Sequence, residues 1–409
     1  MGHIDDSRLV AHKLGSCRKN IYDTVNLFTL LGFTIHPVKS DLEPTQTKQF
    51  LGFVIDSVAI TVKLPPSKAA KVKSACQNLV LNCNPIIREV AQVIGLIVSS
   101  FPAVQYAQLH YRTLESEKIH ALKVNAGNYE FTMTVSQMAK TELTWWIENI
   151  DMASRPIMFG NPEITITTDA SNLGWGAVCN GTKTGGPWGK DKADFHINYL
   201  EMKAVRLGLK SLCNNTTGKH VRVQSDNTTT VSYINEMGGI KSVLCNDMVQ
   251  TIWAWCIGSN IWLIACHIPG SQNTDADKQS RVFNVSTEWS LCTQVFEDIQ
   301  KLWGKSDVDL FASRLNFKIP SYISCRPDPN AMFVNALYMN WHDYSFYVRT
   351  EKHFKPSYRY HHPILDFWNP ETIPTTQGPH SHVLMTGGGG VRRIFLGLTF
   401  WPKGIFSGL

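Results

Sequence analysis

The stretch Ile164-Thr165-Ile166-Thr167-Thr168-Asp169-Ala170-Ser171 decides the fold that we expect for the centre of this chain. Its β-branched residues predict a strand that ends at Asp169, and the following Gly174-Trp175-Gly176-Ala177 indicates the second arm of a hairpin. Further strands are predicted at 221–223 and 261–265, with helices at 199–212, 227–235 and 244–256. This alternation is typical of an α/β domain, which we place at 161–285.

Four carboxylates stand at the ends of these predicted elements. Asp169 ends the first strand, Glu201 lies in the first turn of a helix, and Asp226 ends the next long strand. Asp277 opens the last helix. Strand ends and helix N-termini gather at one edge of an α/β sheet, so the four side chains can converge. Clustered carboxylates need cations to neutralise them. Mg²⁺ prefers oxygen ligands, and two such ions about 3.5–4 Å apart suit phosphodiester cleavage.

Each acid also has a purely structural explanation. Glu201 and Asp277 follow Asn198 and Thr274 at the spacing of a capping box. The acid that ends the 221–223 strand could be an N-cap, and the acid that ends the first strand could serve a turn. Caps that arose independently have no reason to recur in one fixed order, which favours the chemical explanation.

The order of the four acids resembles that of a type 1 ribonuclease H domain, whose catalytic set is Asp, Glu, Asp, Asp. The resemblance implies a ribonuclease H-like mixed five-stranded sheet with flanking helices, and catalysis and metal binding by all four acids. It further implies two Mg²⁺ ions, for which Mn²⁺ can substitute, and the RNA strand of an RNA–DNA hybrid as substrate. The matching segments also imply substrate-binding residues beside the acids, namely Ser171, Asn198, Asn227 and His267.

Upstream, His3-Ile4-Asp5-Asp6 and Phe50-Leu51-Gly52-Phe53 resemble the end of a reverse transcriptase palm, with His3 where that family usually has Tyr. The resemblance makes Asp5 and Asp6 a vestigial polymerase metal site. It implies a partial α+β palm at 1–66 and a helical thumb and connection at 67–160. Polymerisation by two metals needs a further Asp from an upstream strand, and only two residues precede His3, so we expect no primer extension.

The order palm, thumb, connection and ribonuclease H, followed by Asp307-Val308-Asp309-Leu310-Phe311, resembles the polyprotein of a DIRS-type retrotransposon. A gypsy-type element is the nearest alternative. We assign 286–345 to a retroelement C-terminal extension. The segment 346–409, with its run Gly387-Gly388-Gly389-Gly390, is expected to be an irregular tail. Besides the hybrid, other segments of such a polyprotein are the expected partners.

Composition limits the remaining possibilities. A hydrophobic share of 43% and a charged share of 18% exclude global disorder, and a net charge of +6 permits a polyanionic partner without demanding one. The ten cysteines form no CxxC pair, which indicates reduced thiols inside a cell, in the cytoplasm or nucleus. The most apolar stretch, 90–104, is interrupted and too short to cross a bilayer, so we expect no membrane partner.

Two other functions remain open. The chain could be a catalytically decayed remnant that binds nucleic acid without cutting it, and the absence of a basic substrate handle at 236–244 favours this alternative. A different nuclease or an integrase on the same fold is the second alternative. Cleavage of an RNA–DNA hybrid, of duplex DNA or of neither would separate the three hypotheses.

Overall fold

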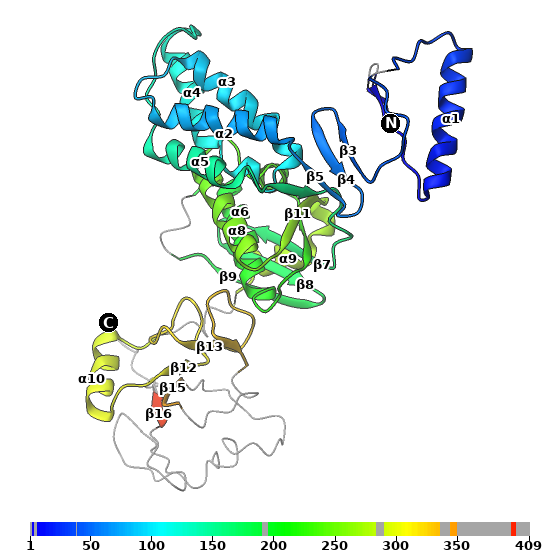
Figure 1. Cartoon of the computed structure of the whole chain (residues 1–409). Helices are drawn as coiled ribbons and strands as arrows, with labels where there is room; N and C mark the ends of the chain where they lie inside the picture. Colours follow the sequence, from blue (N-terminus) through cyan, green and yellow to red (C-terminus); the bar gives the residue numbers. More distant parts are fainter. Residues whose placement is uncertain are drawn as a thin grey trace, which may run out of the picture. The chain divides into compact units, whose positions relative to one another are not determined.

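The computed structural model describes residues 2–3, 6–37, 39–189, 195–283, 290–335, 344–349 and 394–397. Contacts divide the chain into two compact units. The first unit comprises Met1–Asn161 with Glu236–Gln250, and the second comprises Pro162–Asn235 with Thr251–Leu409. The second unit holds the four predicted acids. Figure 1 labels most of the helices and strands of the chain.

The first unit begins with short elements. β1 (Gly2–His3) pairs antiparallel with β2 (Asp6–Ser7), and α1 (Leu14–Leu30) follows without a buried residue. A four-stranded antiparallel sheet has the order β3-β4-β5-β6, formed by Thr47–Phe50, Phe53–Asp56, Thr61–Lys63 and Ser154–Pro156.

Four helices pack together in the rest of this unit, α2 (Pro66–Leu81), α3 (Ile87–Val98), α4 (Arg112–Val124) and α5 (Gln137–Asn149). Pro66 is the first residue of α2, where proline loses no helical hydrogen bond. Short 3₁₀ turns at Phe101–Ala103 and Ala107–Leu109 separate α3 from α4. These helices and the strand β6 thus occupy most of 67–160, and the assignment of that segment as a helical thumb and connection stays a prediction.

The second unit contains a five-stranded mixed sheet with the order β11-β10-β7-β8-β9. β7 (Ile164–Ala170) is parallel to β10 (His220–Ser225), which is parallel to β11 (Trp262–His267). On its other side β7 is antiparallel to β8 (Gly174–Cys179), and β8 is antiparallel to β9 (Thr182–Pro187). This is the mixed five-stranded sheet with helices that the sequence predicts, and the fold class is confirmed.

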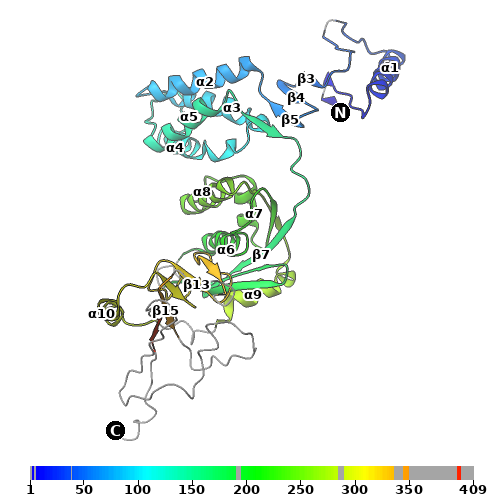
Figure 2. The same ribbon diagram turned by 60° about the horizontal axis from the view of Figure 1, so that its bottom comes forward.

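Two helices cover opposite faces of this sheet. A Cβ added to Gly208 of α6 (Ile197–Leu212) would lie 2.9 Å from the Cβ of Ala177 in β8. A Cβ on Gly176, the preceding residue of β8, would instead lie 2.2 Å from the Ala276 carbonyl oxygen in α9 (Thr274–Arg281). Because neighbouring residues of a strand point to opposite faces, α6 and α9 must lie on different sides (Figure 2).

Two further helices lie between β10 and β11 in sequence, α7 (Thr228–Asn235) and α8 (Val243–Gly258). A single turn, η3 (Gly270–Gln272), joins β11 to α9. α9 begins at Thr274, three residues before Asp277, so the prediction that Asp277 opens this helix is wrong. Among the described residues, no helix is both long and apolar enough to span a membrane.

A second, all-parallel sheet follows α10 (Thr293–Trp303). Its order is β14-β13-β12-β15-β16, built from Phe333–Val334, Tyr322–Ser324, Val308–Leu310, Phe346–Arg349 and Ile394–Gly397. β15 and β16 fall within 346–409, where the sequence predicted an irregular tail. The other residues of that tail, apart from these two strands, lie outside the described part of the chain.

Candidate metal centre

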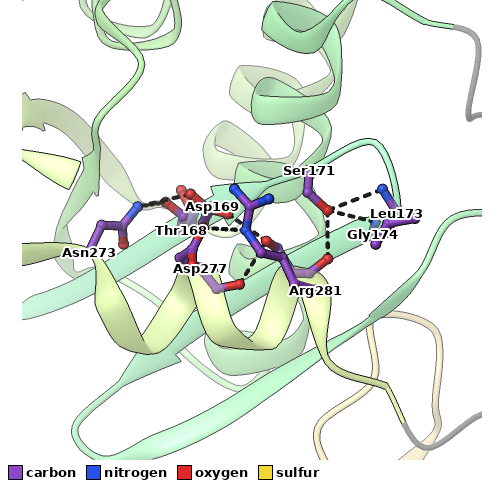
Figure 3. A network of polar contacts seen from close by, with 9 residues as sticks. Thr168, Asp169, Ser171, Leu173, Gly174, Asn273, Asp277 and Arg281 are labelled. Carbon is purple, nitrogen blue, oxygen red and sulfur yellow. Dashed lines mark hydrogen bonds and ion pairs between the residues drawn. The ribbon is translucent and has the colours of Figure 1, made fainter. Parts of the chain in front are cut away.

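Asp169 occupies the buried end of β7 and is only 4% exposed. Two side chains presented by η3 and α9 hold its carboxylate. The Asn273 amide donates to Oδ1 at 3.3 Å (Figure 3). The Ser280 hydroxyl donates to Oδ2 at 2.6 Å. The helix reaches the strand this closely because β8 presents Gly176 to it, where any side chain would collide with the Ala276 carbonyl.

Glu201 lies in the second turn of α6, close to where the helix begins. The His196 Nδ1 accepts a hydrogen bond from the Asn198 backbone at 3.2 Å and caps the helix. Asn198 is therefore inside the helix, and the capping-box explanation of Glu201 does not hold. The Glu201 carboxylate is 4% exposed, and its Oε2 has no hydrogen-bond partner among the residues that the structure describes. A buried oxygen in this state is costly unless a cation binds it.

Asp226 follows the last residue of β10 and is partly buried. The next residue, Asn227, caps α7 by accepting a hydrogen bond from the Thr230 backbone at 2.8 Å. Asp226 is thus not needed as the cap. The turn after β11 comes close to it, since a Cβ on Gly270 would lie 3.1 Å from Oδ2 of Asp226. A glycine at this point leaves the carboxylate accessible.

Asp169, Glu201 and Asp226 converge although they belong to three separate elements. One carboxylate oxygen of each lies within 4.8 Å of the others, a separation at which a single ion can bind all three. The three ligands are oxygens, the donor type preferred by hard divalent cations such as Mg²⁺. The orphaned Glu201 oxygen and the burial of two of the acids fit a divalent metal ion.

The electrostatics of the cluster agree with this conclusion. Burial is the main cause that raises the pKa of Asp169 to about 6. Repulsion from Asp226 and Asp277 raises this pKa further, whereas the hydrogen bond from Ser280 lowers it. Burial also raises the pKa of Glu201 to about 9, with added repulsion from Asp169 and Asp226. Without a cation these carboxylates hold protons more tightly than usual. A bound divalent ion would favour their ionised forms.

Asp277, the fourth predicted acid, is outside this group of three. It lies on α9, and its Oδ1 accepts from the Arg281 Nε at 2.6 Å across one helical turn. Its negative charge still contributes to the raised pKa of Asp169, so it stands near the cluster. A role for Asp277 as ligand to a second ion stays a proposal.

The four residues predicted to bind substrate are placed differently. The Ser171 hydroxyl is buried, donates to the Ser280 carbonyl at 2.7 Å and accepts from the Gly174 backbone, so it stabilises the β7–β8 turn. Asn227 donates to the side-chain oxygen of Asn198 at 2.9 Å, beside the acidic group. His267 is exposed at the end of β11, paired in register with Ser225. Substrate contacts by these residues remain proposals.

The predicted polymerase site lies largely outside the described residues. Asp5 lies outside the described residues, as does Ile4 before it. Asp6 belongs to β2, opposite His3 of β1, and only its backbone is described. The vestigial metal site at Asp5 and Asp6 stays a prediction.

Sequence reasoning missed Asn273 and Ser280, the two residues that hold Asp169. Asn273 is 1% exposed and donates at 3.1 Å to the Thr168 carbonyl as well as to Asp169. Ser280 is fully buried. The signal that could have found them is their spacing from Asp277, four residues before and three after, which places all three near one face of a helical turn.

No protein-family model matches the chain, and no curated protein matches its sequence. Among solved structures, the foamy viral protease-reverse transcriptase in complex with double-stranded DNA matches with a TM-score of 0.31 and 13% identity. That match covers 64% of this chain, but this chain spans less than half of the viral protein, 44%.

Two ribonuclease H1 structures match a smaller part of the chain. The enzyme from the halophilic archaeon Halobacterium salinarum is 14% identical with a TM-score of 0.24, covering 28% of this chain and 92% of the enzyme. A second, in complex with an RNA/DNA hybrid, is 20% identical with a TM-score of 0.26, covering 29% and 93%. At these scores the function has to be derived from the residues of the site.

Proposed function

We propose that this chain is a divalent-metal-dependent nuclease that cuts the RNA strand of an RNA–DNA hybrid. The observation that carries the proposal is the convergence of Asp169, Glu201 and Asp226, whose carboxylate oxygens lie within 4.8 Å of one another at the end of β7. Two of the three are almost completely buried, and one buried oxygen has no partner among the described residues. An acidic cluster of this kind has little structural value without cations.

The chemistry follows from the ligands. These three acids would hold Mg²⁺, with Mn²⁺ as a substitute, and Asp277 would complete the set when a second ion is present. Bound divalent ions supply an activated water, a polarised phosphate and a stabilised leaving oxygen. The residues of the chain contribute orientation, because Asn273 and Ser280 together fix both oxygens of Asp169. The hybrid as substrate, rather than another nucleic acid, rests on the family resemblance of the motifs.

The test is cleavage of a labelled RNA–DNA hybrid by the full chain in Mg²⁺ and in Mn²⁺. We expect cleavage by the parent and a loss of at least roughly 100-fold in Asp169→Asn and Asp226→Asn, since each removes a metal ligand. Asp275→Asn is the matched control, because Asp275 is an exposed acid on the same α9 that pairs with Lys183 at 2.7 Å. The control should cleave like the parent.

Three other results would overturn the proposal. Full cleavage in both acid variants would show that the cluster is not the active site. Salt-sensitive binding of the hybrid with no cleavage in either metal would replace the nuclease by a nucleic-acid-binding protein. Cleavage of duplex DNA in place of the hybrid would favour another nuclease on this fold. A retrotransposon origin, of DIRS or gypsy type, and a place among other polyprotein segments are further proposals that rest on the motifs alone.

A further inference from the structure

The acidic cluster raises a problem for any nucleic-acid substrate, since a phosphate backbone is repelled by carboxylates. A cationic side chain is needed at the edge of the site in addition to metal ions. Arg281, the last residue of α9, lies one helical turn after Asp277 and next in sequence to Ser280, which holds Asp169. Figure 3 shows the guanidinium reaching back over Asp277 towards Asp169.

The geometry of Arg281 leaves the two Nη groups of its guanidinium available to bind a phosphate. Its Nε donates to Oδ1 of Asp277 at 2.6 Å, whereas the structure records no hydrogen bond from its two Nη groups within the described ranges. The side chain is 56% exposed, so these groups face solvent at the edge of the site. A guanidinium held through Nε has a fixed plane, and a fixed plane is what bidentate binding of a phosphate requires.

The charge of Arg281 is also coupled to the cluster itself. The hydrogen bond and the charge of Asp277 raise its pKa, and the charges of Asp169 and Asp226 act in the same direction. The guanidinium is therefore within electrostatic reach of three acids of the site. An exposed ion pair such as Arg281–Asp277 contributes little to stability, which leaves this arrangement without a strong structural purpose.

We propose that Arg281 binds a backbone phosphate of the nucleic-acid substrate beside the acidic cluster, with Asp277 orienting its guanidinium. This inference rests on the proposed function, because it assumes a nucleic acid at the same site. It assigns to α9 two tasks, holding Asp169 through Ser280 and gripping the substrate through Arg281. Ser280 is buried and orients a carboxylate, whereas Arg281 is exposed and would attract a phosphate by its charge.

The test is binding of a fluorescein-labelled RNA–DNA hybrid to the full chain in EDTA, where no cleavage occurs, at several KCl concentrations. We expect Arg281→Ala to weaken binding roughly three- to tenfold at low salt and to reduce the salt slope by about one. Arg281→Lys keeps the charge but loses the planar fork, and should fall between the parent and Arg281→Ala. Lys278→Ala, an exposed cation on the same helix, is the control and should change binding less than twofold.

The outcomes separate this inference from the proposed function. Unchanged affinity and salt slope in Arg281→Ala, or an equal loss in Lys278→Ala, would overturn the role of Arg281. A loss of thermal stability in Arg281→Ala with unchanged binding would mean that the residue is purely structural. A parent chain that binds the hybrid through Arg281 but never cleaves it would refute the nuclease and leave the phosphate contact standing.

Discussion

The Ser280 hydroxyl donates a 2.6 Å hydrogen bond to Oδ2 of Asp169 across 111 residues of sequence. The bond joins α9 to β7, the central strand of the mixed sheet, and both partners are buried. It orients the carboxylate without using its other oxygen, which Asn273 contacts. Residues that orient a ligand in this way govern metal affinity nearly as strongly as the ligands do.

Removing this hydrogen bond should impair the site more than the fold. We expect Ser280→Ala to lower hybrid cleavage and apparent Mg²⁺ affinity roughly 10- to 100-fold, because Asp169 loses its orientation. Ser211→Ala is the matched control, since its hydroxyl bonds only to the Leu207 carbonyl within α6. Cleavage rates over a Mg²⁺ titration measure both quantities. Parent-like values in Ser280→Ala would refute a positioning role.

The close contact between β8 and α9 predicts a strong effect of one methyl group. In Gly176→Ala the new Cβ would lie 2.2 Å from the Ala276 carbonyl and 2.7 Å from the Gln279 Cβ. We expect a loss of roughly 1–3 kcal/mol in the free energy of unfolding, and weaker cleavage because α9 must shift.

The control for this substitution is Gly95→Ala in α3, where a Cβ would meet nothing within 4 Å. A glycine inside a helix costs up to about 1 kcal/mol relative to alanine, so the control should be neutral or more stable. Urea denaturation of both variants tests the prediction. Equal stability of the two alanine variants would show that α9 is not held against β8.

The raised pKa of Glu201, about 9, makes the stability of the metal-free protein depend on pH. The folded state keeps this proton above the ordinary carboxyl pKa of 4.5, whereas the unfolded state releases it. The contribution of Glu201 to stability is therefore fully present below about pH 4.5 and is lost as the pH rises towards 9. We expect the melting temperature in EDTA to be lower at high pH than at mildly acidic pH, measured by thermal shift.

Two comparisons isolate the contribution of Glu201. Glu201→Gln cannot ionise, so its melting temperature should decline less over the same interval of pH. Mg²⁺ should stabilise the parent most at high pH, because a cation favours the ionised cluster. A parallel decline in parent and variant would contradict the assignment of this pH dependence to Glu201.

Arg314 lies in the segment that follows the predicted nuclease domain, and its side chain contacts that domain. Its Nη2 donates to the Pro187 carbonyl at the end of β9, its guanidinium lies 5.8 Å from the centroid of the Trp175 ring, and its backbone donates to Asp328. We expect Arg314→Ala to lower the free energy of unfolding by roughly 1–2 kcal/mol, since the Pro187 carbonyl loses its donor and the Trp175 ring loses its cationic neighbour, whereas the backbone bond to Asp328 is kept.

Arg326→Ala, an exposed arginine two residues after β13, is the control for this variant. It should unfold at the same urea concentration as the parent. If Arg314→Ala also behaves like the parent, residues 290–335 do not stabilise the mixed sheet of β7 to β11 through this contact.

Much of the central fold could be predicted from sequence because its strands are rich in β-branched residues. β9 could not, since Thr182-Lys183-Thr184-Gly185-Gly186-Pro187 has a weak strand propensity and is extended through its pairing with β8. Its glycines serve packing instead. A Cβ on Gly185 would lie 2.8 Å from the Gln279 carbonyl of α9.

The acids of the candidate site were accessible to sequence reasoning because strand ends and helix starts can be located from periodicity. Asn273 and Ser280 were not, since their importance arises only from the tertiary approach of α9 to β7. The start of α9 was misplaced for a related reason. Asn273 precedes the helix with its side chain turned to Asp169, and so it provides no side-chain cap that would mark the boundary.

The 111-residue span between Asp169 and Ser280 also determines when the site exists. A ribosome translating this chain makes β7 long before α9, and a nascent domain cannot orient Asp169 until the last helix has left the exit tunnel and docked. A chain that stops just before Asn273 would therefore contain every strand of the mixed sheet and the three clustered acids, but neither of the two residues that hold Asp169.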